Sequence, residues 1–382
     1  MRPNADDALV LVLNAGSSSV KYQVVDPASG DARLRGVVER IGEGATADHE
    51  AAFDEIWVDL ERHDVTAATL AAIGHRVVHG GASLVDATVV DEGVLAEIDD
   101  LARLAPLHNP PSAAGIRRAR RHYPDLPQVA VFDTAFFADL PAAAATYAVP
   151  RELTATGIRR YGAHGISHQY VAGEAARFLG RPVGELDQIV LHLGNGASAS
   201  AISKGRPVDT SIGLTPLEGL VMGTRAGDVD PGLLLHLLRH GDLDLEGLEQ
   251  MLHRRSGLLG MTGMTDFRDV ARSMCEGDPD ALAAYDVYVH RLRKYVGAYL
   301  AVLSGADVIT FTAGIGEHDP RLRADCLAGL ERLGIVLDRA RNEESAGASR
   351  VSADDSAVAV LVVPTNEELA IARQVVDALA GR

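Results

Sequence analysis

The sequence predicts an α/β protein with a duplicated core, because one pattern of strand and glycine-rich loop occurs three times. Residues 9–25 hold a continuous apolar run, a short polar loop and a second run that alternates apolar and polar residues. Residues 189–202 repeat this order, and in residues 308–317 a third apolar run ends in two glycines. Short apolar runs bounded by turn residues are typical of buried strands. Two of the patterns lie half a chain apart, so we expect two related halves able to close on a nucleotide.

The first loop has the composition of a phosphate-binding turn without the spacing of a Walker motif. It joins two predicted strands and contains Asn14, Gly16, Ser17, Ser19 and Lys21. A Walker loop needs a fixed glycine-to-lysine spacing and a helix after the lysine, whereas a strand follows here. Phosphate contacts would therefore come from backbone N–H groups and serine hydroxyls at a hairpin tip. Taken alone, the same residues are equally well explained by an ordinary tight turn.

Length and composition predict a globular protein of two domains. The chain has 382 residues, of which 47% are hydrophobic and 23% charged, and its formal net charge is −17. This acidic balance argues against a nucleic-acid or anionic-membrane partner. The two cysteines have no metal-ligand spacing around them, which fits a reducing cytoplasm. The N-terminus shows no signal-peptide pattern and no apolar run reaches membrane length, so we expect no membrane association.

In the first half, charged residues are predicted at the ends of strands. A short strand in residues 73–81 carries Arg76, and a strand in residues 129–132 ends at Asp133. Ligands of α/β proteins usually bind at the carboxyl ends of the strands. An alanine-rich stretch with prolines at both ends follows, so we place the domain boundary near Pro150.

Helices and one proline-rich loop separate these strands. A helical apolar period covers residues 91–104. Prolines exclude a helix interior in residues 105–111, so this segment is predicted to be a rigid loop. Ser112 is expected to cap the next helix, whose four arginines are interpreted as a solvated face.

The second half contains a long irregular segment, residues 207–230, and such segments are usually functional. The longest helix is predicted over residues 281–304, with an apolar stripe that is either core or a dimer seam. Asp319 is expected to cap a further helix. A strand in residues 360–363 precedes a capping box that begins at Thr365 and opens the last helix.

Three residues in glycine-flanked irregular segments are candidates for phosphoryl transfer: Arg76, His164 and Arg225. This reaction depends mainly on positioning, Mg²⁺ and cations around the transferred oxygens. A single loop arginine is ordinarily solvated, but three such sites that bracket glycine-rich loops favour function. Three further histidines are also explained as structural hydrogen-bonding residues: His79, His108 and His192.

The chain resembles the acetate kinases of the acetate and sugar kinase, Hsp70 and actin superfamily. The resemblance runs in order along the whole chain. Its nine segments are NAGSSSVK from Asn14, GHRVVHGG from Gly74, APLHNPP from Ala105, VFDTAF from Val131, RRYGAHG from Arg159, HLGNGAS from His192, GLTPLEGLVMGTR from Gly213, FTAGIGE from Phe311 and PTNEEL from Pro364.

This resemblance implies two duplicated ribonuclease-H-like domains of the actin-like ATPase type with a nucleotide cleft between them. Residues 1–150 with 366–382 would form the N-terminal lobe, which holds the acyl substrate and the first phosphate loop. Residues 151–365 would form the C-terminal lobe, which holds the second phosphate loop, the adenosine site and the dimer contacts. The implied protein is a cytoplasmic homodimer that transfers the ATP γ-phosphoryl group reversibly to acetate. Its implied cofactor is Mg²⁺, or Mn²⁺ in its place.

The resemblance also implies a role for each candidate residue. Arg76 matches the ligand of the acetate carboxylate, His164 and Arg225 match transition-state stabilisers, and Asp133 matches a catalytic acid. A carboxylate substrate is already ionised at pH 7 and needs no general base. We therefore interpret Asp133 as a group that positions Mg²⁺, water or an arginine. The implied metal ligands are Asn14 and Glu367, and the implied ATP-binding residues are Ser17, Ser19, Lys21, His192, Leu193, Gly194, Asn195, Gly196, Asp266, Phe267, Arg268, Gly314, Ile315, Gly316, Glu317 and His318.

Two positions depart from the pattern of the family. Ala163 stands where the family usually has phenylalanine, and the implied acyl pocket consists of Val78, Leu107, Ala163 and Pro216. Loss of the ring enlarges this pocket, and each further methylene that it buries is worth about 0.8 kcal/mol. We therefore hypothesise that propionate, or even butyrate, is used unusually well. His318 stands where the family usually has asparagine, which leaves the nucleotide-base preference open.

Three other interpretations compete with acetate kinase. A propionate kinase would use the same chemistry with a larger pocket. A nucleotide-driven binding protein of the Hsp70 type would leave Arg76 and His164 unexplained and would need a substrate-binding β domain. A catalytically impaired relative is conceivable because Ala163 neighbours His164, but the intact set of candidate residues argues against it.

Overall fold

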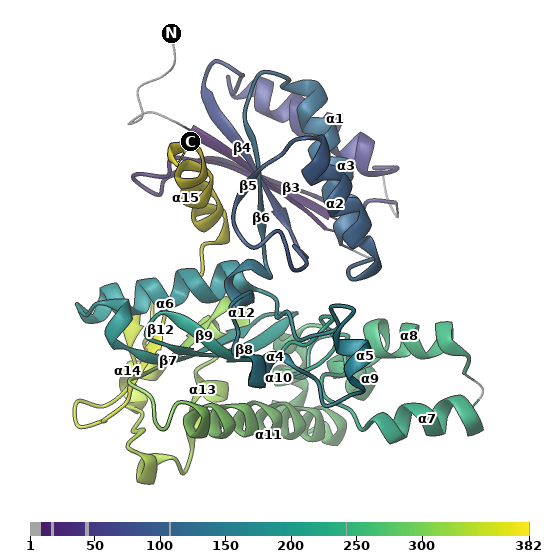
Figure 1. Cartoon of the computed structure of the whole chain (residues 1–382). Coiled ribbons are helices and arrows are strands. Elements are labelled where there is room, and N and C mark those ends of the chain that lie inside the picture. Colours follow the sequence, from purple (N-terminus) through teal and green to yellow (C-terminus); the bar gives the residue numbers. More distant parts are fainter. Residues whose placement is uncertain (1–8, 17–18, 43–45, 107, 242, 382) are drawn as a thin grey trace. The chain divides into compact units, whose positions relative to one another are not determined.

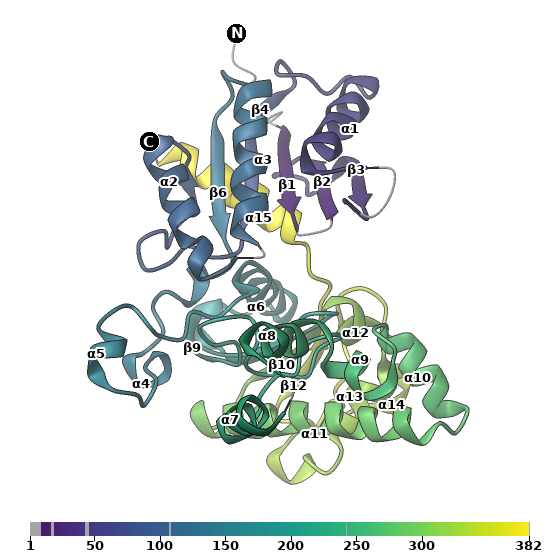
Figure 2. The same ribbon diagram turned by 90° about the vertical axis from the view of Figure 1, so that its right-hand side faces the viewer.

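The computed structural model describes residues 9–16, 19–42, 46–106, 108–241 and 243–381. The chain divides into two compact units. Unit 1 comprises Met1–Ala138, Gly165–Ser167 and Asn366–Arg382, and unit 2 comprises Asp139–His164 and His168–Thr365. Within the described residues each unit holds one mixed sheet of six strands with helices on its faces (Figures 1 and 2).

The strands of unit 1 are β1 (Leu9–Ala15), β2 (Ser19–Val25), β3 (Ala32–Glu39), β4 (Leu70–Val77), β5 (Thr88–Val89) and β6 (Gln128–Phe132). Its helices are α1 (His49–Arg62), α2 (Glu92–Asp100), α3 (Asn109–His122) and α15 (Glu367–Ala380), with short 3₁₀ turns η2 (Leu101–Arg103) and η3 (Ala135–Phe137).

The strands of unit 2 are β7 (Asp187–Leu193), β8 (Ala197–Ser203), β9 (Arg206–Thr210), β10 (Val308–Thr312), β11 (Ser349–Arg350) and β12 (Ala359–Val362). Its helices are α4 (Ala142–Ala145), α5 (Arg151–Thr154), α6 (Gly165–Leu179, of which the first three residues belong to unit 1), α7 (Pro231–His240), α8 (Leu245–Arg254), α9 (Gly257–Thr262), α10 (Phe267–Cys275), α11 (Pro279–Val302), α12 (Ala313–His318), α13 (Pro320–Leu327) and α14 (Arg339–Glu343), with turns η4 (Val183–Glu185) and η5 (Glu331–Leu333).

The two sheets share one topology, which confirms the predicted duplication. Their strand orders are β3-β2-β1-β4-β6-β5 and β11-β12-β10-β7-β8-β9. In each sheet the first two consecutive strand pairs are antiparallel, and the first strand is parallel to the fourth. The second order, reversed, matches the first strand for strand. The two glycine-containing loops therefore occupy equivalent hairpins.

Side-chain alternation explains how helices cover both faces of the unit 1 sheet. Leu11 and Leu13 of β1 are buried with residues of α1 and α3. On the other face, Gly74 of β4 lies so close to Val375 and Ile371 of α15 that a Cβ at this position would meet both side chains. Successive side chains of a strand point to opposite faces. Figure 1 shows α15 and the α1–α3 group on opposite sides of this sheet.

In unit 2, α6 and α11 cover opposite faces of the sheet (Figure 1). Leu191 and Ala199 are buried together with Leu292 and Val296 of α11. The predicted face of this helix was partly wrong, because Leu282 is 47% exposed and the neighbouring Ala281 is buried instead. Within the described part of the chain, no helix is long and apolar enough to cross a membrane.

Three local predictions need correction. The prolines after Asn109 lie in the first turn of α3, where proline is tolerated, and the Ser112 hydroxyl donates to the His108 carbonyl instead of capping the helix. The cap of α15 is Asn366, which accepts from the backbone N–H of Leu369, so the predicted cap at Thr365 was one residue early. The first segment of unit 1 ends at Ala138, before the boundary expected near Pro150.

The boundary shifts because the segment after Ala138 makes its contacts in unit 2. The Tyr147 hydroxyl donates to Glu218 and accepts from the backbone N–H of Leu214. The carbonyl of Ala145 accepts from the N–H of Arg160. Composition alone indicates a break at the prolines, whereas these hydrogen bonds decide the unit to which the segment belongs.

Candidate active site

In unit 1, three parallel strands and one helix bring four predicted residues together. Asn14 lies near the end of β1, Arg76 near the end of β4, and Asp133 directly after β6. These strands are adjacent and parallel, so their carboxyl ends lie at one edge of the sheet. Glu367 is the first residue of α15, which packs against the same strands.

Arg76 is the centre of this cluster. Its Nη2 donates to Oδ2 of Asp133, its Nη1 donates to Oδ1 of Asn14 at 3.3 Å, and its Nε lies 3.6 Å from Oε2 of Glu367. The Asp133 side chain is only 1% exposed. Burial acts to lower the pKa of Arg76, but the carboxylates of Asp133 and Glu367 outweigh it and the pKa is raised. The arginine therefore stays charged and holds two carboxylates and an amide oxygen near one point.

In unit 2, the loop between β7 and β8 is the second glycine loop. The N–H of Gly194 donates to the carbonyl of Gly196 at 3.0 Å, which closes the turn. A Cβ built on Gly196 would lie 2.7 Å from Nη2 of Arg225 and 3.3 Å from Nε2 of His164. Two predicted phosphoryl-transfer residues thus converge on this loop, and a side chain at position 196 would displace the Arg225 guanidinium.

His164 has an unusual backbone and a well-defined ring. It precedes α6 with φ 58° and ψ 23°, in the left-handed region that costs a non-glycine residue roughly 1 kcal/mol or more. Its ring stacks on His192 of β7, with the ring centres 4.5 Å apart and the planes 23° from parallel. Strained conformations of this kind cluster at functional sites.

Arg225 is a partly buried cation in an irregular segment. Its Nη1 donates to the carbonyl oxygen of Pro216 at 2.7 Å. Burial lowers the pKa of the guanidinium to about 10. Within the part of the chain that the structure describes, no carboxylate forms an ion pair with this side chain. The positive charge of Arg225 would therefore stabilise a bound anion more strongly than the charge of an arginine that already forms an ion pair.

A cavity of about 690 Å³ in unit 2 adjoins the second glycine loop. Eight of the predicted ATP-binding residues line it: Gly194, Asn195, Asp266, Phe267, Arg268, Gly314, Ile315 and His318. Four lining residues were not predicted: Gly223, Leu258, Thr265 and Asp319. Of these, Gly223 lies in the segment GLTPLEGLVMGTR that begins at Gly213. It approaches the Asn195 side chain so closely that a Cβ at this position would collide with it. Leu258 carries no sequence pattern, because backbone bonds to Met222 bring it there.

The remaining predicted residues lie as follows. Of the predicted ATP-binding residues, Leu193 and Gly316 are buried, Ser19 is partly buried, and Lys21 is exposed on β2 opposite Asn14. The Glu317 carboxylate accepts a hydrogen bond from the N–H of Thr365 at 3.2 Å. Of the predicted acyl-pocket residues, Val78 and Ala163 are buried and Pro216 is partly buried. Ser17 and Leu107 lie outside the described residues.

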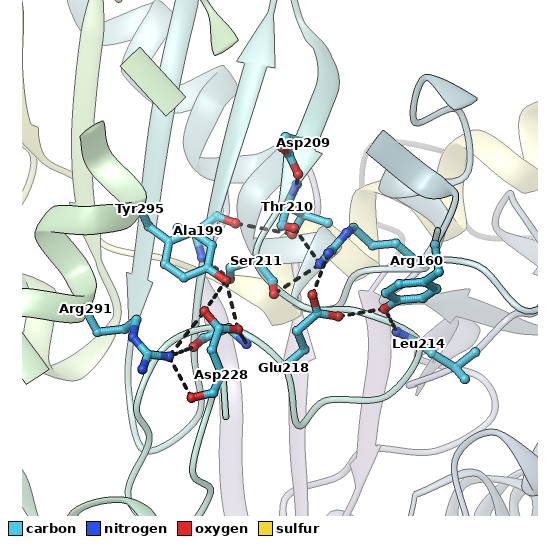
Figure 3. Close-up of polar contacts among 12 residues, drawn as sticks. Arg160, Ala199, Asp209, Thr210, Ser211, Leu214, Glu218, Asp228, Arg291 and Tyr295 are labelled. Atoms are coloured by element: carbon cyan, nitrogen blue, oxygen red, sulfur yellow. Dashed lines mark hydrogen bonds and ion pairs between the residues drawn. The ribbon is translucent and has the colours of Figure 1, made fainter. Parts of the chain in front are cut away.

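Two ion pairs hold the segment that carries Arg225 (Figure 3). Nη2 of Arg160 lies 2.6 Å from Oε1 of Glu218, and Tyr147 donates to the other oxygen of the same carboxylate at 2.6 Å. Further along, Asp228 pairs with Arg291 at 3.2 Å and accepts from Tyr295. The two anchors lie on either side of Arg225 in the sequence.

Replacing Glu218 by glutamine should lower the free energy of unfolding by about 2 kcal/mol, because the partly buried Arg160 loses its charged partner. Urea unfolding measures this change. The matched control is Asp354→Asn, which breaks an exposed ion pair with Arg341 and should change stability little. Equal effects of the two substitutions would show that Glu218 does not anchor the segment.

Several known proteins are similar to this chain. A model of the acetokinase family matches residues 9–373. An acetate kinase from Porphyromonas gingivalis has 38% sequence identity and a TM-score of 0.92, over 97% of this chain and 100% of that chain. A propionate kinase from Francisella tularensis subsp. tularensis has 37% identity and a TM-score of 0.91, over 96% and 98%. An acetate kinase from Entamoeba histolytica has 31% identity and a TM-score of 0.86, over 96% and 98%.

Proposed function

The chain belongs to the acetokinase family, and from this premise we propose that it transfers the γ-phosphoryl group of ATP reversibly to acetate. The products are ADP and acetyl phosphate. One oxygen of the acetate carboxylate attacks phosphorus, and the bond from phosphorus to the bridging oxygen of ADP breaks. No proton has to be removed from the substrate, because the carboxylate is already ionised.

The observation that carries this proposal is the approach of His164 and Arg225 to Gly196. Phosphoryl transfer is accelerated mainly by groups that position the reactants and stabilise charge on the transferred oxygens. A glycine loop, a histidine and a partly buried arginine form such a set. The adjoining cavity, with Phe267 and Ile315 in its wall, would receive the adenosine.

Unit 1 would supply the acyl substrate site and the metal site. Arg76 would hold the acetate carboxylate, since guanidinium groups bind carboxylates with two parallel hydrogen bonds. Asp133 would fix the orientation of Arg76 and needs no role as a base.

The donor set around Arg76 fits Mg²⁺, although the described residues contain no group of three or more His, Cys, Asp or Glu side chains arranged to hold a metal. Mg²⁺ is usually bound through one or two carboxylates together with waters and substrate phosphates. Asn14 and Glu367 would hold it, and Mn²⁺ would suit the same oxygen donors. When bound, the ion would neutralise charge on the phosphates.

The test is formation of acyl phosphate from Mg-ATP with acetate, propionate and butyrate, with the product trapped as the hydroxamate. We expect product with acetate, and loss of product when EDTA removes the metal. Absence of product from all three acids would refute the proposed reaction.

A second candidate, propionate kinase activity, is favoured by Ala163. The larger pocket implied by the missing ring predicts that kcat/KM for propionate equals or exceeds that for acetate. The substitution Ala163→Phe should then shift the propionate-to-acetate ratio toward acetate by about fourfold, which corresponds to about 0.8 kcal/mol for one methylene. A strong acetate preference in the unmodified protein would contradict this second candidate.

The control for this substitution is Ala163→Val, which adds less volume and should shift the ratio less. Because Ala163 is only 5% exposed, a larger side chain can also cost stability by overpacking. Thermal unfolding of both variants measures the loss of stability. The propionate-to-acetate ratio of kcat/KM measures the specificity, and each ratio is taken on one protein.

A further inference from the structure

We propose that Ser200, His168 and Ser198 form a buried hydrogen-bond chain that positions the His164 ring, so that its Nε2 presents an N–H group to the second glycine loop. This inference rests on the proposed function, because it concerns the group that would contact the transferred phosphoryl. The three residues are positioning residues, since they act through His164.

The four side chains come from β8 and from the start of α6, which His164 directly precedes. Ser198 and Ser200 are two residues apart on β8 and share one face of the sheet. His164 and His168 are four residues apart, and the N–H of His168 donates to the carbonyl of His164 at 2.9 Å.

The distances define a continuous chain. Oγ of Ser198 lies 2.9 Å from Nδ1 of His164 and 2.7 Å from Nε2 of His168. Oγ of Ser200 lies 2.7 Å from the other nitrogen, Nδ1, of His168. His168, Ser198 and Ser200 are each 0% exposed. Their hydrogen bonds are therefore shielded from competition by bulk water.

The number of hydrogens limits how this chain can be arranged. A serine hydroxyl has one hydrogen and two lone pairs, so Ser198, placed between two ring nitrogens, donates to at most one of them. His168 is neutral, because burial, and to a smaller extent His192, lower its pKa well below the ordinary value. A neutral imidazole has one N–H and one lone pair. If Ser198 donates to His164, then Nε2 of His168 donates to Ser198 and Ser200 donates to Nδ1 of His168, so all donors point the same way.

The arrangement of the chain decides the tautomer of His164. If the donors run from Ser200 to His164, then Nδ1 of His164 accepts from Ser198 and the neutral ring carries its proton on Nε2. If Ser198 instead donates to His168, or accepts from both rings, then Nδ1 of His164 carries the proton and Nε2 of the neutral ring presents a lone pair. Nε2 is the atom that approaches Gly196, and an anionic phosphoryl oxygen requires a donor there. The first direction is the one that supports transfer.

The kinetic test compares three serine variants of the full chain. Ser198→Ala should lower kcat about 10-fold to 100-fold, as losses of supporting hydrogen bonds commonly do, while KM for ATP and acetate changes by less than about threefold. Ser198→Thr keeps the hydroxyl and should restore most of kcat. The matched control is Ser203→Ala on the same strand, whose hydroxyl donates to Asp187 at 2.6 Å, and this variant should keep kcat.

The structural test reads the tautomer directly and does not depend on activity. Long-range ¹⁵N–¹H spectra of the histidine-labelled protein distinguish the two neutral tautomers, and His164→Gln identifies the signal of His164. We expect the proton on Nε2 in the unmodified protein, and a shifted Nδ1 resonance in Ser198→Ala because its donor is lost.

A proton on Nδ1 of neutral His164, or an unchanged kcat in Ser198→Ala, would overturn the chain. If Ser198→Ala does not fold, Ser198→Thr and the tautomer of the unmodified protein still decide the question. Absence of acyl phosphate formation by the unmodified protein would instead refute the proposed function, while the tautomer would still test the chain.

Discussion

Replacing Arg225 by alanine is expected to lower kcat about 10³-fold, with a much smaller change in KM for acetate. Arginines that contact the transferred phosphoryl group contribute 10³ or more to turnover, in order of magnitude. Arg225 is suited to this role because its Nη2 approaches Gly196 and its side chain is partly buried. Steady-state trapping of acyl phosphate measures the change.

The charge and the shape of Arg225 can be tested separately. Arg225→Lys keeps a positive charge but loses the planar guanidinium, so its kcat should fall between those of the native protein and the alanine variant. Arg254→Ala, at the exposed end of α8, is the matched control and should keep normal activity. An alanine variant at position 225 that folds and keeps more than about a tenth of kcat would exclude a role in stabilising the transition state, for which arginines contribute far more.

Replacing Arg76 by alanine is expected to reduce both activity and stability. Removal of the ligand for the substrate carboxylate should cost about 10³ in kcat/KM, by analogy with other phosphoryl-transfer arginines. The substitution also leaves Asp133, which is 1% exposed, without its charged partner. Loss of one member of a buried ion pair typically costs about 3–5 kcal/mol. Urea unfolding and the acyl phosphate assay measure the two effects.

A double variant separates the two roles of Arg76. Arg76→Ala combined with Asp133→Asn removes the unpaired charge, so stability should recover in part while activity stays low. Arg118→Ala, which breaks a surface pair with Asp54, should change neither. Recovery of activity along with stability in the double variant would mean that Arg76 serves only the fold.

Sequence patterns predicted the fold well where neighbouring residues decide it. The hairpins at Gly16 and Gly194 follow from apolar runs that alternate over a few residues, and the helix that begins at Pro320 follows from a cap at Asp319 that accepts from the N–H of Leu322. Predictions were less accurate where two neighbouring residues are both able to cap a helix, as Thr365 and Asn366 are at the start of α15. Both residue types cap helices, and the choice depends on backbone geometry.

The candidate site shows the same division. Arg76, His164 and Arg225 were singled out because they lie in glycine-flanked segments that local sequence describes. Leu258 in the wall of the cavity was not, because a hydrogen bond from its backbone N–H to the distant Met222 carbonyl places it there. The hydrogen-bond chain to His164 was also absent from the sequence interpretation, since nothing in the order of residues shows that Ser198 lies between two histidines.

The sequence by itself determined the α/β class, the duplication, the glycine loops and the chemical types of the candidate residues, because these depend on composition and short-range periodicity. Only the tertiary structure decided which of those residues lie close together and how burial changes their pKa values. Parallel strands bring Asn14, Arg76 and Asp133 to one edge of a sheet although they lie far apart in the chain. Burial, which is a property of the packed molecule, then lowers the pKa of Arg225 and keeps His168 neutral.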